Sequence, residues 1–431
     1  MALKWVRIRP NHRLLAWIEE RLPLLSFLAA HTSRYYAPKN FNVLYYFGVL
    51  ALVVLVNQIL TGVFLAMHFQ PSAAGAFASV EHIMRDVEWG WLIRYLHSTG
   101  ASLFFVVIYV HMFRALAYGS YKKPRELVWI LGLLIFLVLM AEAFMGYVLP
   151  WGQMSFWGAK VIVSLFGAIP LVGDGLTQWI MGDYLPGDAT LGRFFALHVV
   201  ALPLVLVLLV TLHILALHEV GSNNPDGVEI SEATSEAGVP LDGIPFHPYY
   251  TVEDLFSTSV FLLLAAFVVF FAPTFGGVFL EAENFIAANP LETPAHIKPV
   301  WYFAPYYAML RVVPHKLLGV AVMFGAILAL FLLPWLDRGA VRSVRYRGRG
   351  YRIALALFAV SFVLLGAVGA GVSTTWIPRL FGPEADVTAI ENAFGRFWMF
   401  VYFGFFVFLH LYTRFGFERT RPVPARVRCS E

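Results

Sequence analysis

Eight long apolar segments divide this chain and decide what it can fold into. A helix of about 20 apolar residues crosses the hydrocarbon core of a bilayer, and only helices and closed barrels satisfy their backbone hydrogen bonds there. We therefore predict an all-α, polytopic membrane protein with eight transmembrane helices. The predicted spans are 41–67, 95–118, 127–149, 194–218, 256–273, 315–336, 352–374 and 393–413.

The composition agrees with this class and excludes others. The chain is 59% hydrophobic and 13% charged. Its first apolar segment begins well inside the chain without a following small-residue cleavage site, so no removable signal peptide is expected. The one cysteine, Cys429, excludes an internal disulfide and a cysteine-bound metal cluster. The basic residues flank membrane spans, which argues against a nucleic-acid partner.

The basic residues also predict the orientation. With eight spans both termini lie on one side, and most of the 31 Lys and Arg lie there. By the positive-inside rule both termini are cytoplasmic. The basic run 338–352 is interpreted as facing anionic lipid, or alternatively as receiving a partner subunit. The loop 219–255 contains no Lys or Arg, and its acids are expected to attract protons or simply to be hydrated.

Four histidines lie inside the second and fourth apolar segments as two widely spaced pairs. His97 and His111 are fourteen residues apart (111 − 97), about 40° short of four helical turns. His198 and His213 are fifteen apart (213 − 198), and a kink at Pro203 is expected to absorb the mismatch.

A single histidine on an apolar helix is more often a hydrogen-bonded core residue. Ionisable groups within a membrane are costly, so four at matched depths favour a functional role. If the two helices pack side by side, His97 faces His198 and His111 faces His213. Each facing pair is then able to bind one iron, which predicts two haems.

Glycines repeat the same spacing on the alternate helices. Gly48 and Gly62 lie in the first span, Gly132 and Gly146 in the third, and each pair is fourteen residues apart (62 − 48; 146 − 132). Such glycines usually serve helix packing, but the repeated period favours close approach of flat macrocycles. Two arginines three residues from a histidine are candidates for haem propionates, or alternatively are plain interfacial residues. They are Arg94 and Arg114.

Several motifs resemble a known family, the cytochrome b subunit of the ubiquinol:cytochrome c oxidoreductase, respiratory complex III, of the bacterial type. They are GWLIRYLHSTGAS at 90–102, GYVLPWGQMSFWGA at 146–159, HEVGSNNPDG at 218–227, IPFHPYYT at 244–251 and ANPLETPAHIKPVWYF at 288–303. The resemblance implies that His97 and His198 bind a low-potential b-type haem, and that His111 and His213 bind a high-potential one. It implies the four glycines as haem contacts, and Arg94, Arg114 and Ser120 as the propionate region.

The resemblance also implies the activity. Quinol, taken here as ubiquinol, is oxidised near the outer face, with one electron passing to an iron-sulfur protein and one through both haems to a quinone near the cytoplasmic face. The implied partners are the Rieske iron-sulfur protein and cytochrome c1, in a homodimeric complex within the lipid of a bacterial inner membrane.

Two loops are expected to build the outer quinol site. Residues 150–166 suit a short amphipathic helix, and 274–314 is a long loop with aromatic residues. Aromatic residues at membrane ends are most often interface anchors, but several match family positions at this site. These are Tyr147, Met154, Gly158, Pro299, Trp301, Tyr302 and Tyr307.

Val300 departs from the family pattern. Most relatives carry a glutamate here that is thought to accept a proton from quinol, and valine is unable to do so. Glu142, an intramembrane carboxylate one turn before Gly146, is the first candidate replacement. Its alternative is a hydrogen bond to a neighbouring helix. Weaker candidates lie in the outer loops: Lys160, His296, Glu281 and Glu283.

The cytoplasmic quinone site is predicted around the end of the fourth span. His218 and Asp254 are proton-donor candidates, since histidine titrates near neutral pH and a carboxylate can recharge it. Ser222 and Asn223 follow as binding residues, although a solvated loop is the alternative. Glu253 replaces a lysine common in relatives, which implies a different proton-uptake route.

The chain is divided into a cytoplasmic segment 1–40, a haem-binding bundle 41–218, a cytoplasmic loop 219–255, a four-helix region 256–413 with the outer loop, and a tail 414–431. Three other hypotheses remain open at this point. They are a plastid-type cytochrome b, whose fourth span has a similar fifteen-residue step, a haem-free proton-coupled transporter, and a structural membrane anchor.

Overall fold

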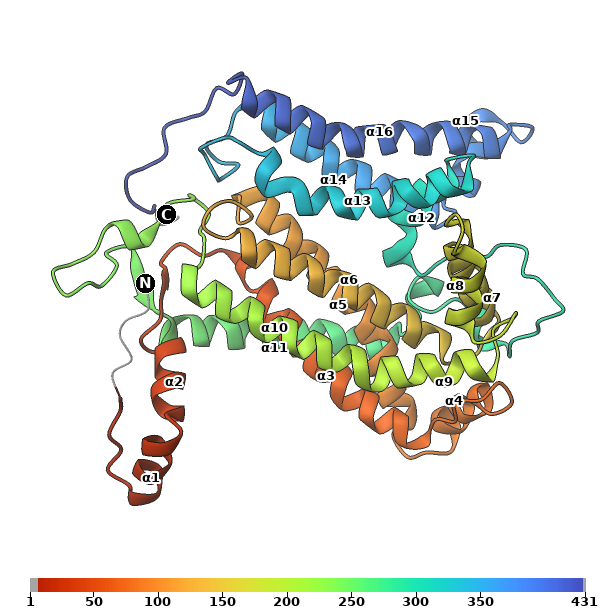
Figure 1. The fold of residues 1–431 in the computed structure, drawn as a ribbon, viewed down its shortest axis with the longest axis horizontal. Coiled ribbons are helices and arrows are strands. Elements are labelled where there is room, and N and C mark those ends of the chain that lie inside the picture. The colour runs from red at the N-terminus through yellow and green to blue at the C-terminus, as the bar shows by residue number, and fades with distance from the viewer. Residues whose placement is uncertain (1–6, 429–431) are drawn as a thin grey trace.

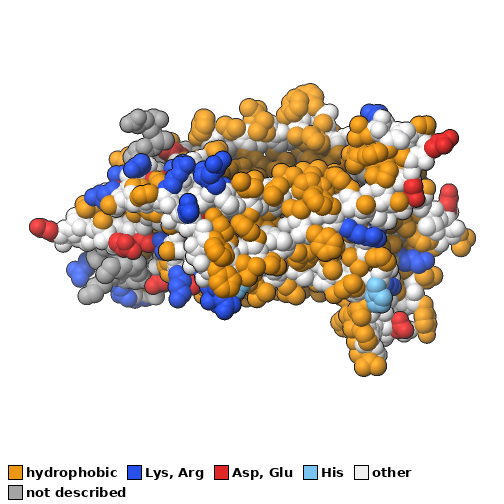
Figure 2. All heavy atoms as spheres, turned by 90° about the horizontal axis from the view of Figure 1, so that it is seen from above, with side chains coloured by type: hydrophobic (Ala, Val, Ile, Leu, Met, Phe, Trp, Pro, Cys, Tyr) orange, Lys and Arg blue, Asp and Glu red, His pale blue; other side chains and the backbone are white. Residues whose placement is uncertain are grey.

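The computed structural model describes residues 7–428, and the regular secondary structure of this part is almost entirely helical. Cys429 lies outside the described residues. Eight helical segments in the described range are long and apolar enough to cross a membrane, as predicted. They run side by side, with loops and short helices at the two ends (Figure 1). Hydrophobic side chains cover the middle of the surface, whereas Lys and Arg gather mainly at one end (Figure 2).

The spans are formed by α3 (Phe47–His68), α5 (Gly90–Tyr118), α6 (Glu126–Val148), α9 (Asp188–Ala196) continued by α10 (Leu202–Val220), α11 (Thr251–Phe271), α13 (Lys316–Leu336), α14 (Arg349–Gly369) and α16 (Val387–Arg414). The shorter helices are α1 (Arg13–Arg21), α2 (Leu24–His31), α4 (Ala76–Arg85), α7 (Gln153–Ser164), α8 (Gly173–Met181), α12 (Ala304–Arg311) and α15 (Ser373–Phe381). The helix expected within 150–166 is confirmed as α7. The fourth and fifth helical segments start earlier than predicted, because hydropathy marks only the apolar part of each helix.

The fourth span is not a regular α-helix. Between α9 and α10, Leu197–Ala201 forms a π turn in which the N–H of Leu202 donates to the carbonyl of Leu197, five residues back. A π turn inserts one residue into a helix. The fifteen-residue step from His198 to His213 is therefore absorbed by this turn. Pro203 follows in the first turn of α10. The extra residue is therefore accommodated by the π turn before the proline, and not by the expected kink at the proline itself.

The second half of the chain packs along one side of the first. In Figure 1, α12, α13, α14 and α16 form one layer, and α13 packs against α6 of the first half. Within the first half, α3 packs on α5 and α6 packs on α10. The sequence assigned α11 to the second half, but α11 packs against α3 and α5. Each histidine-bearing helix therefore packs on a glycine-bearing helix, α5 on α3 and α10 on α6.

A two-stranded sheet joins distant segments at the end that carries both termini, here called the terminal end. β1 (Tyr36–Pro38) pairs antiparallel with β2 (Gly243–Pro245). The opposite end carries α4, α7 and α8, and is here called the distal end (Figure 1). The two ends therefore present different surfaces to the two sides of the membrane.

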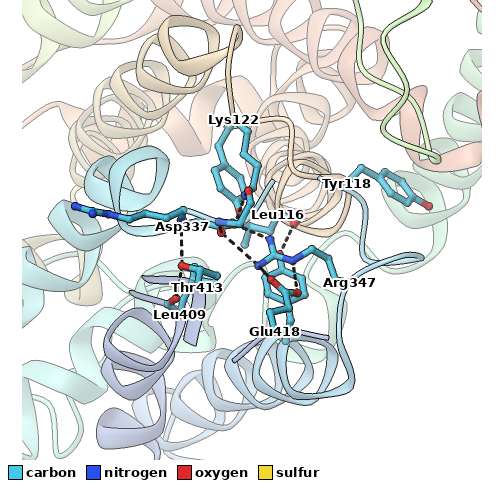
Figure 3. A network of polar contacts seen from close by, with 12 residues as sticks. Leu116, Tyr118, Lys122, Asp337, Arg347, Leu409, Thr413 and Glu418 are labelled. Carbon is cyan, nitrogen blue, oxygen red and sulfur yellow. Dashed lines mark hydrogen bonds and ion pairs between the residues drawn. The ribbon is translucent and has the colours of Figure 1, made fainter. Parts of the chain in front are cut away.

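A buried ion cluster ties the terminal end together (Figure 3). Arg347 is fully buried and contacts Asp337 at 2.7 Å and Glu418 at 2.6 Å. Lys122, in the loop between α5 and α6, lies 2.9 Å from Asp337. Burial opposes the ionisation of Asp337, but the charges of Arg347 and Lys122 outweigh it and hold its pKa below the usual value. This terminal ion cluster joins the first half, the loop before α14 and the C-terminal tail.

Other charged residues of this end are paired within the chain. Arg342 pairs with Glu229, Arg345 with Asp226, and Arg426 with Asp242. The interpretation of the basic run 338–352 as facing lipid is therefore wrong for Arg347, which is fully buried. The expectation that the acids of 219–255 are free and hydrated is wrong for Asp226, Glu229 and Asp242. Hydropathy and charge patterns along the sequence do not reveal these ion pairs, because the two members of each pair are far apart in the chain.

Candidate functional site

The four histidines form two facing pairs between α5 and the fourth span, as predicted. The ring centroids of His97 and His198 are 6.1 Å apart, and those of His111 and His213 are 6.4 Å apart. A metal ion bound to one nitrogen of each ring at about 2 Å leaves the centroids about 6 Å apart. Each pair therefore has the separation of two axial ligands on one iron. His97 and His198 form the distal pair, and His111 and His213 the terminal pair.

In the distal pair, both Nδ1 atoms are held by oxygen atoms. Thr61 Oγ1 lies 2.9 Å from His97 Nδ1, and the carbonyl of Glu142 lies 2.9 Å from His198 Nδ1. The Glu142 carboxylate approaches the same Nδ1 at 3.0 Å. Acceptors on Nδ1 fix the ring orientation and leave Nε2 for a metal, as is usual around metal-binding histidines.

The terminal pair has a different environment. The His213 ring is hydrogen-bonded to the backbone of Val128 rather than to a side chain, and His111 Nδ1 lies 3.5 Å from the Arg114 guanidinium. Arg114 stacks over the Tyr45 ring, and its buried Nε lacks a partner. An unpaired, buried guanidinium is costly unless an anionic group meets it. Arg114 therefore fits a haem propionate, and Arg94 lines the cavity beside His97 in an equivalent place.

The predicted glycines face the histidine rings. A methyl group on Gly62 would lie 3.2 Å from His97 Cε1, and one on Gly146 only 2.4 Å from His198 Cε1. Gly132 and Gly48 face His213 and His111 at 3.3 Å and 3.5 Å. The four positions thus leave room for the imidazole rings as they stand in the bundle. The fourteen-residue glycine period follows from the histidine period, because each glycine faces one ring.

The donor set suits haem better than a metal ion bound by protein alone. In residues 7–428, no group of three or more His, Cys, Asp or Glu side chains is placed to hold a metal ion. A haem iron needs only two axial ligands, because the porphyrin supplies four nitrogens. Two histidines per site, with a nearby arginine, therefore fit this cofactor.

Two cavities lie at the distal half of the bundle. The first, of about 220 Å³, contains the distal pair and is called the histidine cavity. The second, of about 810 Å³, lies between α6, α7 and α13 and is called the lateral cavity. The lateral cavity is almost entirely apolar and is large enough for a quinone ring with part of its tail.

The residues predicted for the quinol site divide between these cavities. Gly158, Pro299 and Tyr307 line the lateral cavity, whereas Tyr147 and Tyr302 line the histidine cavity with Val300. Met154 is buried and lines neither cavity, and the Trp301 indole N–H donates to Ser102 at 3.2 Å.

Two carboxylates, the partly exposed Glu142 and the buried Glu281, lie near these cavities and have different contacts. Glu142 lines the histidine cavity and contacts His198, which places it at a candidate metal ligand rather than in the lateral cavity. Glu281, a minor candidate from the sequence, accepts a hydrogen bond of 3.0 Å from the Tyr147 hydroxyl. The separation of 134 residues between Glu281 and Tyr147 explains why no sequence spacing pointed to this contact.

At the terminal end, His218 lies in a stack of rings. Its ring is 4.4 Å from Tyr35 at 8°, and 5.0 Å from His31 at 24°. Ser222 Oγ is 3.0 Å from the Tyr35 hydroxyl. Sequence reasoning missed His31 and Tyr35, since they come from the N-terminal segment.

The other predicted terminal residues lie on neighbouring elements. The Asn223 amide donates to the Tyr118 carbonyl at 2.6 Å and to Ser120 Oγ at 3.3 Å. Asp254 is in the first turn of α11, and the adjacent Glu253 accepts a hydrogen bond from the Tyr46 hydroxyl. Glu253 is therefore held by α3, in the place where relatives were expected to carry a lysine.

Comparisons with known proteins agree with this site. The family model described as "Cytochrome b/b6/petB" matches residues 32–221, and "Cytochrome b(C-terminal)/b6/petD" matches residues 287–382. Cytochrome b of Allochromatium vinosum is 55% identical over 421 residues, covering 96% of this chain and 98% of the relative. Cytochrome b of Rhodospirillum rubrum is 52% identical over 364 residues, covering 84% and 86% of the two chains.

A fused relative and a solved structure also match. The "Cytochrome b/c1" protein of Bradyrhizobium diazoefficiens is 46% identical over 96% of this chain, which covers 57% of that longer protein. A chain of the solved "Hyperthermophilic respiratory Complex III" matches with a TM-score of 0.82 and 35% identity, over 93% of this chain and 99% of that one. The transporter, anchor and plastid-type hypotheses give way to these matches. The chain belongs to the cytochrome b family, the haem-binding electron-transfer subunits of the bacterial respiratory chain, and is a multi-pass core subunit of respiratory complex III, a quinol:cytochrome c oxidoreductase.

Proposed function

We propose that this chain binds two b-type haems and moves electrons from a quinol oxidised in the lateral cavity to a quinone reduced at the terminal end. The observation that carries the proposal is the presence of two histidine pairs, with ring centroids 6.1 Å and 6.4 Å apart, at two depths of one bundle. Two histidine ligands leave an iron no open position, which suits electron transfer rather than oxygen binding.

The haems, when bound, supply one-electron steps between the two sides of the membrane. His97 and His198 hold the distal haem, and His111 and His213 the terminal haem. Thr61 and the Glu142 carbonyl fix the distal imidazoles at 2.9 Å. Arg94, Arg114 and the Ser120 region receive the propionates, where their charge compensates that of the carboxylates.

The lateral cavity binds the quinol, taken as ubiquinol. Its walls are apolar and aromatic, with Gly158, Pro299 and Tyr307 among them. Glycine at 158 leaves space for the quinol ring beside α7. The wall toward the histidine cavity carries Tyr147 and Tyr302, so the quinol lies close to the distal haem.

The terminal quinone lies beside the His218 ring stack. His218 and Asp254 donate the two protons that a reduced quinone requires, and Ser222 and Asn223 bind its carbonyl groups. The stacked rings of Tyr35 and His31 restrict His218 to one orientation. Proton release at the distal end and uptake at the terminal end together add to the proton gradient in a Q-cycle.

The orientation and partners complete the proposal. Lys and Arg gather mainly at the terminal end (Figure 2), which supports a cytoplasmic location for both termini under the positive-inside rule. The proposed partners are a Rieske iron-sulfur protein and cytochrome c1, in a dimer of the complex in the bacterial inner membrane. The fused Bradyrhizobium relative, named for both b and c1, supports the second partner.

One variant tests the quinol assignment. Gly158→Trp fills the lateral cavity, so the purified complex should lose ubiquinol oxidation while retaining both haem absorbance bands. A redox titration of the haem absorbance should then still show two midpoint potentials. Wild-type quinol oxidation in this variant would show that the quinol binds elsewhere.

A further inference from the structure

A quinol loses protons as it is oxidised, and the lateral cavity offers few groups to take them. Val300, which lines the neighbouring histidine cavity, has no ionisable group. Among the described residues that line the lateral cavity, the ionisable side chains are Arg193, Lys298, Tyr306 and Tyr307, and none is a carboxylate. A carboxylate that accepts the quinol proton must therefore lie outside the lateral cavity.

Tyr147 is a polar group between the two cavities. It lines the histidine cavity together with Val300, and its ring is the nearest neighbour, at 3.8 Å, of the space that a side chain on Gly158 would occupy. Gly158 itself lines the lateral cavity. The Tyr147 ring thus stands between the two cavities, and its hydroxyl points to Glu281 at 3.0 Å.

Glu281 is held firmly in this place. It is 3% exposed and directly precedes the short 3-10 helix η7 (Ala282–Phe285), which packs against α7. The Asn284 carboxamide oxygen accepts hydrogen bonds from the N–H and hydroxyl of Ser155, both at 3.0 Å. The Ser155 hydroxyl also donates to the Tyr147 carbonyl at 2.6 Å. The carboxylate and the phenol are therefore positioned by one network.

We propose that Tyr147 and Glu281 form a two-member proton relay that accepts the proton that Val300 is unable to take. The quinol O–H bond breaks as its proton passes to the Tyr147 oxygen, and the Tyr147 proton passes to Glu281. Tyr147 is unchanged, Glu281 becomes a carboxylic acid, and the electron leaves separately to the acceptors of the established reaction. Glu281 then releases its proton to water at the distal end. This relay rests on the proposed quinol site.

The charge environment supports the assignment. Burial raises the pKa of Glu281, which moves it toward the operating range of a general base. The charged or titratable groups that act on it are Tyr147, Tyr302, Lys298 and Glu283. A group with a raised pKa becomes a base as the pH rises through that pKa. Quinol oxidation should therefore increase with pH in the wild-type complex.

The test compares Glu281→Gln with Glu283→Gln in the purified complex, with a short-chain ubiquinol as substrate. Glu281→Gln should lower the oxidation rate at least about tenfold, since general bases contribute about 10²-fold or more, and should remove the rise with pH. Glu283, exposed and two residues away, should be replaceable with little change. Both haem spectra and both midpoint potentials should stay normal in each variant.

A second variant separates proton transfer from a structural role. Val300→Glu introduced into Glu281→Gln should restore a large part of the rate and the pH dependence. A wild-type rate and pH profile in Glu281→Gln would overturn the relay. So would a double variant that remains as slow as Glu281→Gln. If Gly158→Trp fails to block quinol oxidation, the proposed quinol site is wrong, and that result is independent of Glu281.

Discussion

The two histidine pairs have the same ligands and different surroundings. Each pair lies near one arginine, Arg94 at the distal pair and Arg114 at the terminal pair. Only the distal pair has a carboxylate in contact, because Glu142 lies 3.0 Å from His198 Nδ1. The terminal His213 is hydrogen-bonded to the backbone of Val128, and no carboxylate of the described residues pairs with it. The two sites therefore differ in one negative charge, which only the distal pair contacts.

This difference predicts a direction for electron flow. A carboxylate that accepts a hydrogen bond from an axial histidine increases the electron donation of that ligand, which favours ferric iron and lowers the reduction potential. A site with a nearby arginine and no carboxylate favours ferrous iron. Electrons should therefore pass from the distal haem to the terminal haem. The physical argument agrees with the low- and high-potential assignments implied by the family resemblance.

The strongest test of the comparison is to remove one ligand from each pair. His198→Ala should eliminate the distal haem and His213→Ala the terminal haem, so that each purified variant contains about half the haem. Redox titration should then show only the higher potential in His198→Ala and only the lower potential in His213→Ala.

His410 provides the control for this experiment. It lies within α16, and its Nδ1 is buried without a hydrogen-bond partner, so it is as unusual in a membrane as the ligands are. His410→Ala should retain both haems. Loss of haem from His410→Ala, or two haems in His198→Ala, would refute the assignment of the pairs.

The helices and histidine pairs were predictable because they depend on local repeats. Apolar length marks the eight spans, and helical periodicity places His97 and His111 on one face. The facing of His97 and His198 also followed, since only one packing of the two helices matches both depths. The π turn at Leu197–Ala201 was not predicted, although the fifteen-residue step was the signal for it.

Contacts between distant segments were not predictable from the sequence. The Tyr147 hydroxyl meets Glu281 across 134 residues, and Arg347 meets Glu418 across 71. No periodicity connects such positions, and composition alone suggested solvated loops. The sequence placed Glu142 close to the quinol site, but its side chain turns to His198. Side-chain direction depends on packing, which a single sequence does not contain.

The terminal ion cluster allows the next test, because it lies at the same end of the molecule as the terminal pair and away from the distal one (Figure 1). Arg347 is fully buried between Asp337 and Glu418. Arg347→Ala removes the ion-pair partner of Glu418 and leaves Asp337 with Lys122 alone, which should cost about 3–5 kcal/mol. On heating, the variant should release the terminal haem at a lower temperature than the wild type, as followed by absorbance.

Arg345→Ala is the matched control. Arg345 is 45% exposed and pairs with Asp226, so its loss should cost less than about 1 kcal/mol. Equal destabilisation by both variants would show that burial of the cluster is unimportant. Earlier loss of the distal haem in Arg347→Ala would contradict its role at the terminal end.

The glycines allow a smaller, local test of the same comparison. A methyl group at Gly146 would lie 2.4 Å from His198 Cε1, whereas one at Gly48 would lie 3.5 Å from His111 Cε1. The first distance forces the ring to move and the second is an ordinary contact. Gly146→Ala should alter the spectrum of the distal haem, and Gly48→Ala should leave the terminal haem nearly unchanged. Electron paramagnetic resonance measures both responses. An equal response would contradict the prediction, because it would show that both sites accommodate an added methyl group equally well.

Glu142→Gln is expected to have the smallest effect, but it tests directly the charge that distinguishes the distal pair from the terminal pair. The amide keeps the size of the side chain and the Glu142 carbonyl keeps its 2.9 Å contact with His198, so only the negative charge is removed. The midpoint potential of the distal haem should rise by several tens of millivolts, while that of the terminal haem stays fixed and serves as the internal control. The two potentials then approach each other, which weakens the driving force between the haems. An unchanged distal midpoint potential would mean that the carboxylate does not distinguish the two pairs. If quinol oxidation fell while the distal midpoint potential stayed unchanged, Glu142 would instead act as a proton acceptor.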